Sequence, residues 1–376
     1  MRVIQIADYE GPYAGSFVPM LRAVSAAVRE RGGTVQTAFS PAARDRPWLA
    51  ELEADAVPVS FAPKGDRRDR ARFIAGLAGG GGEPTILHTH FTSFDLPAVR
   101  VSRARPATPV FWHLHQPRPA DRAGHVLGAV RFAVAARRVD KILCVAPEIA
   151  ASVQSRHAPR DRVMVLPNAI DLERFPRRSR ARTAEARRRL GIRAGAPVLL
   201  HFGWDWDARG GELFVAAARR LAEREPVVAV SVGGGAAARS ARDRAGLGED
   251  VVRVIEPVED VAQLYAAADV FVATSRSEGM PFAVAEALAS GLPVVATDIA
   301  GHADLAHQAG NVRLTLHAAD EVAASVRRTL ATELRLAEDM GARARARVSD
   351  HMDLEAWSER VVALYERALA PLGHLS

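Results

Sequence analysis

The chain has 376 residues, 48% of them hydrophobic, which is enough for two domains that each bury a core of their own. Its net charge of +6 comes almost entirely from arginine, but the densest arginine run, residues 174–193, contains only one aromatic side chain, Phe175, and this argues against nucleic-acid binding. The single cysteine, Cys144, excludes a disulfide within the chain, and the sequence has neither the apolar run of a signal peptide nor that of a membrane-spanning helix, so we expect a soluble, cytoplasmic protein.

Short apolar runs alternate with helical patterns along most of the chain. The candidate strands are residues 3–7, 34–39, 85–90, 109–115, 141–146 and 163–167, followed by residues 197–203, 227–233, 251–256, 269–274 and 293–298. Runs this apolar, separated by helices, are typical of parallel strands buried on both faces. The pattern therefore predicts an α/β protein with two doubly wound domains.

An arginine-rich segment separates the two series of strands. Residues 176–184 are polar and poor in large apolar side chains, so we interpret them as a solvated linker. Attraction of this region to an anionic membrane surface or to an anionic substrate stays open as an alternative. Long helices without intervening strands are expected from about residue 320 to residue 369.

The stretch from Ser277 to Thr297 carries the strongest chemical pattern. Glu278 follows a predicted strand directly and thus lies at a carboxyl end, where open α/β sheets place their ligands. Pro281 suits the first position of a helix, which makes Met280 the expected N-cap. Methionine has no side-chain oxygen to cap with, so the amides of Phe282 and Ala283 are expected to be free to bind an anion such as phosphate.

A second glutamate lies inside the helix predicted after Pro281. Val284 and Leu288 are one turn apart and should face the core, whereas Glu286 should point to nearly the opposite side, on an exposed or cleft face with Phe282. Each glutamate has a plain alternative: Glu278 as an acceptor for loop amides, and Glu286 as a solvated helix residue. The two together are more informative than either alone.

The segment EGMPFAVAEALASGLPVVATD, residues 278–298, resembles the signature of family 4 of the retaining GT-B glycosyltransferases, in which seven residues separate two glutamates. Residues 165–175, residues 260–279 and the loop at Gly15 before a helix are similar to further segments of that family, in the same order. The resemblance implies two Rossmann-like domains that face a central cleft. It also implies an acceptor domain of residues 1–176 with a returning C-terminal helix, residues 352–376, and a nucleotide-sugar domain of residues 177–351.

The same resemblance assigns roles to individual residues. Glu278 would lie beside the transferred sugar and Glu286 would hold the ribose hydroxyls. The residues that would surround the sugar and the diphosphate are Met280, Pro281, Phe282, Ala283, Gly15 and Gly203.

The segment from His201 to Gly211 departs from the family pattern. Many members have two cations here that hold the diphosphate, whereas this chain has Trp204 in the first place and Arg209 in the second. A tryptophan cannot neutralise phosphate, but Arg209 can still bind it with two parallel hydrogen bonds. The Gly-Trp-Asp variant is similar to one branch of the family. Arg276 either supplies a compensating charge or faces solvent.

Two His-x-His pairs are expected on one face of neighbouring strands: His88 with His90, and His113 with His115. Such a cluster raises a metal site as an alternative, but no carboxylate or cysteine stands at ligand spacing, so we predict no metal. His115 matches the family histidine that approaches the donor sugar. His113 lies one step further inside and is interpreted as a core residue.

The resemblance predicts transfer of a sugar from a nucleoside diphosphate sugar, UDP-sugar favoured over GDP-sugar, to an acceptor hydroxyl, with retention at the anomeric carbon and without metal or other cofactor. The acceptor would be a small molecule or a glycan, such as a natural product or a cell-surface glycan precursor, in a GC-rich bacterium; the oligomeric state stays open. Two alternatives remain. One is a phosphorylase or sugar-nucleotide epimerase of the same fold, and the other, suggested by Trp204, is a non-catalytic nucleotide-sugar-binding protein.

Overall fold

A computed structural model of the chain forms two compact units. One comprises Met1–Ala169 together with Leu354–Ser376, and the other comprises Ile170–Asp353, whereas the sequence predicted boundaries after residues 176 and 351. The structure describes residues 1–11, 14–79, 83–116, 128–129, 131–192, 195–258, 260–332 and 334–370. The end of the predicted C-terminal helix, residues 371–376, therefore lies outside the described residues.

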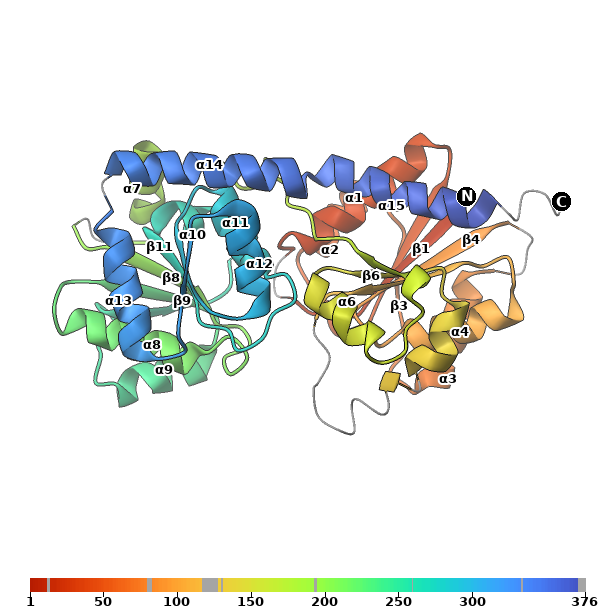
Figure 1. Cartoon of the computed structure of the whole chain (residues 1–376), viewed down its shortest axis with the longest axis horizontal. Helices are drawn as coiled ribbons and strands as arrows, with labels where there is room; N and C mark the ends of the chain where they lie inside the picture. The colour runs from red at the N-terminus through yellow and green to blue at the C-terminus, as the bar shows by residue number, and fades with distance from the viewer. Residues whose placement is uncertain are drawn as a thin grey trace. The chain divides into compact units, whose positions relative to one another are not determined.

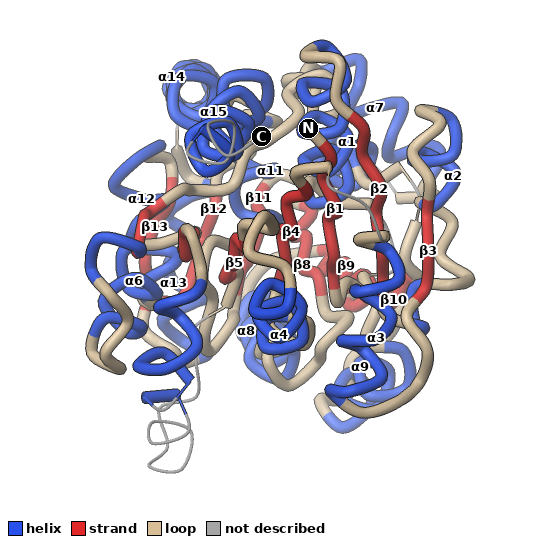
Figure 2. The backbone as a smooth tube through the Cα atoms, turned by 90° about the vertical axis from the view of Figure 1, so that its right-hand side faces the viewer, coloured by secondary structure: helices blue, strands red, loops and turns tan. Residues whose placement is uncertain are grey.

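The first unit contains a parallel sheet, in which the described residues form seven strands in the order β3-β2-β1-β4-β5-β6-β7. Figure 2 labels the first five of these strands. These strands are β1 (Arg2–Ala7), β2 (Thr34–Phe39), β3 (Val59–Phe61), β4 (Thr85–His90), β5 (Val110–Leu114), β6 (Lys141–Cys144) and β7 (Val163–Val165). The central strands β4 and β5 are buried along their whole length, as expected for a sheet covered on both faces.

Helices cover both faces of this sheet. They are α1 (Phe17–Glu30), α2 (Leu49–Ala54), α3 (Arg67–Leu77), α4 (Asp95–Ala104), α6 (Pro147–Gln154) and α15 (Leu354–Leu369), with shorter helical turns at Pro41–Ala43, Arg131–Ala135, Ala136–Arg138 and Arg160–Arg162. Helix α15 packs on α1, and α3 packs on α4; Figure 1 shows these two pairs on opposite faces of the sheet. Ion pairs from Arg31 to Glu359 and Glu366 also join the end of α1 to α15, so the last helix belongs to the first unit.

The second unit also consists of a parallel sheet with helices packed on it. Its described strands form a parallel sheet in the order β10-β9-β8-β11-β12-β13. They are β8 (Val198–Phe202), β9 (Val228–Val232), β10 (Val252–Ile255), β11 (Val270–Ala273), β12 (Val294–Thr297) and β13 (Val312–Thr315). The order reverses between β8 and β11, and the carboxyl ends at such a reversal are where open α/β sheets bind ligands.

Eight helices accompany this sheet among the described residues: α7 (Arg180–Arg189), α8 (Gly211–Ala222), α9 (Gly235–Arg244), α10 (Ala262–Ala267), α11 (Phe282–Ala289), α12 (Ala300–Ala309), α13 (Ala319–Leu330) and α14 (Leu334–Met352). Helix α8 packs on α9 and α13, while α11 packs on α12 and α14 (Figure 1). Within the part of the chain that the structure describes, no helix combines the length and the apolar character needed to cross a bilayer.

All eleven predicted strands are present, and the predicted α/β architecture is confirmed. The pattern missed β3 and β13, which are short strands at sheet edges. Because an edge strand is not covered on both sides, its sequence lacks the long apolar run of a central strand.

The interpretation of residues 176–184 as a linker is wrong for its second half, because α7 begins at Arg180. Ser179 caps this helix by accepting a hydrogen bond from the amide of Arg182, at 3.3 Å. Arginine and alanine favour helices, and α7 packs on α10, so a segment without an apolar face still becomes a helix.

Candidate functional site

The site in the second unit is formed by two loops that leave neighbouring strands. Strand β8 ends at Phe202 and continues into the loop that precedes α8, while β11 ends at Ala273 and continues into the loop that precedes α11. Since β8 and β11 are adjacent and parallel, both loops emerge at the same edge of the sheet. This edge is the point at which the strand order reverses.

Backbone contacts hold these two loops together. Gly210 has a φ of +68°, and a Cβ atom placed on it would lie 2.1 Å from the carbonyl oxygen of Thr274. The hydroxyl of Thr274 donates to the carbonyl of Arg209 at 2.9 Å, and the amide of Arg276 donates to the carbonyl of Ala208 at 3.1 Å. Only glycine fits at position 210, because both the left-handed backbone and the close approach exclude a side chain.

The loop contacts bring three of the predicted residues together. Arg209 forms an ion pair with Glu278, and its guanidinium carbon lies 5.2 Å from the centre of the Trp204 ring. Ser275 donates to Oε1 of Glu278 at 2.9 Å. Trp204 therefore holds the guanidinium of Arg209 by a cation–π contact. Arg276 is exposed, which agrees with the solvent-facing alternative for that residue.

Trp206 is a functional neighbour that the sequence analysis missed. Cβ atoms added to Gly203, Gly211 and Gly234 would lie only 3.1, 2.3 and 2.7 Å from its ring, so these glycines leave room for the indole. Its Nε1 donates to Glu212 at 3.2 Å. The three glycines were visible in the sequence, but their common partner was not, because they come together only in the folded unit.

Helix α11 starts one residue later than predicted. Pro281 is the N-cap, with an extended backbone (φ −73°, ψ 106°), and its carbonyl accepts from the amides of Val284 and Ala285 at 3.2 Å. The assignment of Pro281 to the first helical position and of Met280 to the cap is therefore wrong. The predicted consequence remains, because the amides of Phe282 and Ala283 have no acceptor among the residues that the structure describes.

Glu286 does not lie on an exposed face. It is only 2% exposed, and the hydroxyl of Tyr265 donates to its Oε2 at 2.8 Å and to the carbonyl of Ala283 at 3.1 Å. The prediction allowed an exposed or a cleft face, and the exposed alternative is wrong, because the helix packs on the sheet and also on α14. Tyr265, in α10, is the second residue that the sequence analysis missed, although it lies within residues 260–279, which resemble a segment of the family.

In the first unit, Gly15 lies just before α1 and has a left-handed backbone, with a φ of +52°. Pro12 and Tyr13 of the same loop lie outside the described residues. His115 follows β5 and is buried, and its Nε2 lies 3.2 Å from Nδ1 of His90. Asn168 lies close enough to the ring of His115 to affect its pKa, which links two segments that the family resemblance singled out separately.

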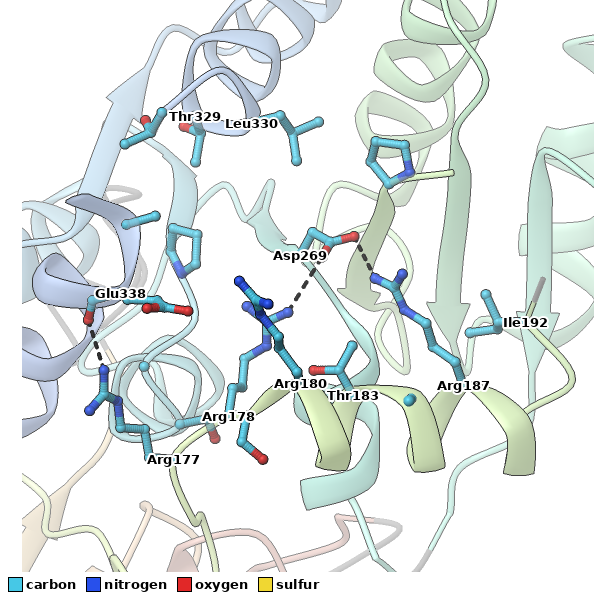
Figure 3. Close-up of a pocket in the computed structure, with 18 of the residues that line it drawn as sticks. Arg177, Arg178, Arg180, Thr183, Arg187, Ile192, Asp269, Thr329, Leu330 and Glu338 are labelled. Carbon is cyan, nitrogen blue, oxygen red and sulfur yellow. Dashed lines mark hydrogen bonds and ion pairs between the residues drawn. The ribbon is translucent and has the colours of Figure 1, made fainter. Parts of the chain in front are cut away.

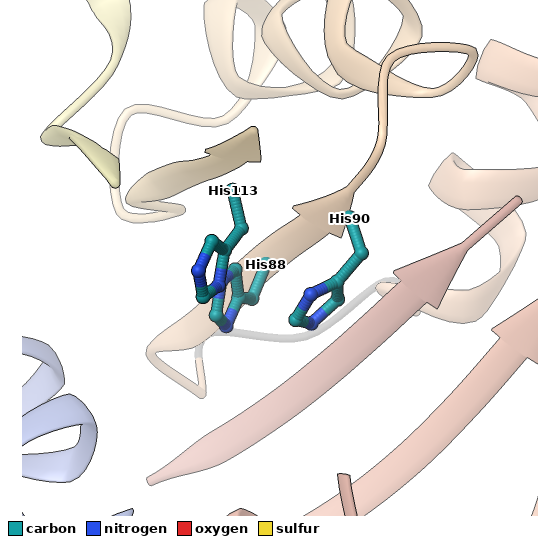
Figure 4. A group of neighbouring side chains, drawn as sticks. All are labelled: His88, His90 and His113. Carbon is teal, nitrogen blue, oxygen red and sulfur yellow. The ribbon is translucent and has the colours of Figure 1, made fainter. Parts of the chain in front are cut away.

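Four histidines form one cluster on β4 and β5, as the alternation predicted; Figure 4 shows His88, His90 and His113. Burial lowers the pKa of His88 and of His115 to about 3, and burial together with the neighbouring histidines lowers the pKa of His90 and His113 well below the usual value. All four rings are therefore neutral at pH 7. The hydroxyl of Tyr365 contacts Nδ1 of His88 at 2.5 Å.

The cluster offers three ring nitrogens, from His88, His90 and His113, all within 4.8 Å of one another. Three histidines form the ligand set of some zinc sites. However, the group contains only neutral donors and is fully buried, so a divalent cation here would have no compensating negative charge. The donor set therefore fits a resident divalent metal poorly.

Comparison with known proteins agrees with this arrangement. The model of the family described as Glycosyltransferase Family 4 matches residues 20–174, and the model described as Glycosyl transferases group 1 matches residues 196–332. Together the two models cover most of both units.

The chain is similar to D-inositol 3-phosphate glycosyltransferases. It is 34% identical to that of Geodermatophilus obscurus over 49% of this chain and 43% of the relative, and 31% identical to that of Thermomonospora curvata over 58% and 57%. The chain thus spans about half the length of the curated relatives it matches.

Two solved structures share the fold over nearly the whole chain. Anabaena Alr3699/HepE in complex with UDP-glucose has a TM-score of 0.83 at 18% identity, covering 98% of this chain and 100% of that one. Sucrose-phosphate synthase from Thermosynechococcus elongatus has a TM-score of 0.82 at 19% identity, covering 99% and 100%.

The two parallel sheets with flanking helices, together with these matches, define a protein of the GT-B class. Within that class, the chain belongs to the glycosyltransferases that these two models describe together, Glycosyltransferase Family 4 in the first unit and Glycosyl transferases group 1 in the second.

The buried histidines predict a loss of stability in mild acid. Their pKa values are lowered in the folded chain, so below about pH 6.5 only the unfolded chain binds protons there, and each of His88 and His115 destabilises the fold by about 1.4 kcal/mol per pH unit until pH falls to about 3. We expect the melting temperature to fall between pH 7.5 and pH 5.5. The substitution His113→Phe should reduce this pH dependence, whereas His351→Asn, at an exposed position, should not. Equal melting temperatures at both pH values would contradict the neutral cluster.

The contact between Gly210 and Thr274 predicts a large effect of one methyl group. Gly210→Ala combines left-handed strain, about 1–2 kcal/mol, with overpacking against a backbone oxygen, about 1–3 kcal/mol more. Gly246→Ala is the matched control, since Gly246 has a φ of +70° and open space around it. Thermal unfolding should show a clearly lower midpoint for Gly210→Ala; equal midpoints would show that the loops can separate freely.

Proposed function

We propose that the protein is a retaining glycosyltransferase that moves a sugar from a nucleoside diphosphate sugar, preferably a UDP-sugar, to an acceptor hydroxyl. One observation carries this proposal: a guanidinium at Arg209, a carboxylate at Glu278 and the amides of Phe282 and Ala283 meet at one edge of the second sheet. A sugar diphosphate carries groups complementary to each, because its phosphates accept hydrogen bonds and its sugar hydroxyls donate them.

Donor binding would rearrange the ion pair. Arg209 would exchange the carboxylate of Glu278 for diphosphate oxygens, and Trp204 would keep the guanidinium in place through its ring face. Glu278 would then accept hydrogen bonds from the sugar, with Ser275 still holding Oε1. The amides of Phe282 and Ala283, at the positive end of α11, would also stabilise the negative charge of the leaving diphosphate.

The nucleoside would be held further along α11. Tyr265 fixes the carboxylate of Glu286 by donating to Oε2, and the ribose hydroxyls would donate to this carboxylate only after it becomes accessible on donor binding. Uracil is favoured as the base by analogy with Alr3699/HepE, which binds UDP and UDP-glucose. Tyr265 is thus a positioning residue for Glu286.

In the first unit, His115 would approach the donor sugar and Gly15 the diphosphate. The neutral ring of His115 suits this role, since it can accept or donate one hydrogen bond without adding charge. The departing diphosphate itself would take the proton of the acceptor hydroxyl. Arg209 and the amides of α11 would supply the charge stabilisation, so the reaction would not need a divalent metal.

The acceptor would be a hydroxyl of a small molecule or of a glycan precursor made in the cytoplasm. The similarity to D-inositol 3-phosphate glycosyltransferases supports a polyhydroxylated, phosphorylated acceptor as the first compound to test. Turnover of the donor with such acceptors would exclude a non-catalytic binding protein. Transfer of the sugar to the acceptor, detected as a glycoside, would exclude an epimerase or a phosphorylase.

Substitution of Arg209 tests the site directly. Arg209→Gln removes the cation that would meet the leaving diphosphate, and kcat/KM for UDP-sugar transfer should fall about 10²–10³-fold. Arg276→Gln is a matched control, because Arg276 lies on the neighbouring loop and is exposed. A similar loss in both variants, or none in Arg209→Gln, would contradict the role of Arg209.

The stereochemical course is a separate test. NMR of the first product formed from an α-linked UDP-sugar should show an α-glycoside, and excess chelator should leave the rate unchanged. A β-linked product would contradict retention, and loss of activity with chelator would contradict metal independence.

A further inference from the structure

A cavity lies in the second unit, at the opposite edge of the sheet from Glu278. Its volume is about 880 Å³ (Figure 3). It is lined by the residues that precede three strands, Pro197 before β8, Asp269 before β11 and Pro293 before β12, and by the first turns of α7. Because the strands are parallel, these residues mark their amino ends, whereas Arg209 and Glu278 follow carboxyl ends.

Positive charge dominates the wall of this cavity. Five arginines line it, against two carboxylates: Arg177, Arg178, Arg180, Arg187 and Arg188, with Asp269 and Glu338. Asp269 accepts from Arg187 at 2.6 Å and from Arg178 at 3.4 Å, so one carboxylate serves two guanidiniums. Among the described residues, the side chain of Arg177 donates only to the carbonyl of Glu338, at 3.0 Å, and Arg188 pairs with Glu185, which does not line the cavity. The wall therefore keeps a positive excess.

Two of these arginines lack full compensation. Nε of Arg178 is buried without a hydrogen-bond partner among the described residues, and burial, with the nearby charge of Arg187, lowers the pKa of Arg178. Arg180 is exposed and forms no ion pair or side-chain hydrogen bond within the described ranges of the chain, and Figure 3 shows its side chain and that of Arg178 pointing into the cavity. Like charges on one wall repel one another, and an anion bound between them would relieve this repulsion.

The backbone adds to the positive potential in the cavity. Helix α7 has ten residues and starts at Arg180, so the positive end of its dipole faces the same cavity. Apolar side chains, including Ile192 and Leu330, form another part of the wall. The volume is within the range of small-molecule sites, roughly 300–1,000 Å³.

We propose that this cavity binds a small molecule that carries a phosphate or diphosphate group, with Arg178, Arg180 and the start of α7 as the anion site and the apolar wall as the seat of its organic part. The proposal does not depend on glycosyl transfer, because no residue of the candidate donor site lines the cavity. Its occupant would neutralise the arginines that Asp269 leaves uncompensated.

Inorganic pyrophosphate is a suitable probe, titrated by calorimetry into the wild-type chain and three variants. Arg180→Gln removes a cation that forms no ion pair or side-chain hydrogen bond within the described part of the chain, and it should weaken binding at the cavity about tenfold. Arg189→Gln is the matched control, since it removes the same charge from the same helix outside the cavity, and it should leave the dissociation constant within about twofold. Circular dichroism would verify that each variant is folded.

Arg209→Gln separates the two sites. Pyrophosphate binding that is sensitive to Arg180→Gln should persist in Arg209→Gln, whereas any binding at the candidate donor site should weaken. Equal affinities in Arg180→Gln and Arg189→Gln, or binding abolished by Arg209→Gln alone, would overturn the cavity proposal. Failure of transfer activity in the wild type would leave the titration result unaffected, so the two proposals fail independently.

Discussion

The contact between Gly210 and the carbonyl of Thr274 is the constraint on which the candidate donor site depends. The two loops belong to segments more than sixty residues apart in the chain, and they meet because β8 and β11 are neighbours at the reversal of strand order. Once the loops are joined, Arg209 reaches Glu278, and the indole of Trp204 lies against the guanidinium. The positive end of α11 follows on the same loop. The strand order thus determines where Arg209 and Glu278 lie, and Gly210 allows the two loops to come close enough for these residues to meet.

Arginine provides charge at both edges of the second sheet, but in different environments. At the carboxyl edge, Arg209 is held by one carboxylate and one aromatic face, which suits a cation that must be released to a ligand. At the amino edge, Arg178 and Arg187 share Asp269, and Arg180 has no described partner. In the first unit, by contrast, the clustered side chains carry no charge, because burial keeps the four histidines neutral. Composition alone, with its excess of arginine, did not distinguish these environments.

Apolar periodicity predicted the central strands and the two α/β units, because buried parallel strands require long apolar runs. It missed β3 and β13 at the edges, and it read the start of α7 as a linker, because that helix is stabilised by its cap and by α10 rather than by an apolar face of its own. In the site, the sequence predicted the individual residues Arg209, Glu278 and Glu286. It did not predict that Glu286 is buried against Tyr265 or that Trp206 packs on three glycines, since these contacts join segments that only the tertiary fold brings together.

The central claim is that Arg209 and the first amides of α11 hold a diphosphate. A crystal structure with UDP bound would test it most directly. The account predicts that the guanidinium of Arg209 leaves Glu278 for phosphate oxygens, that the amides of Phe282 and Ala283 donate to the same diphosphate, and that Glu286 accepts from the ribose. UDP bound at another place, with Arg209 still paired to Glu278, would contradict the account.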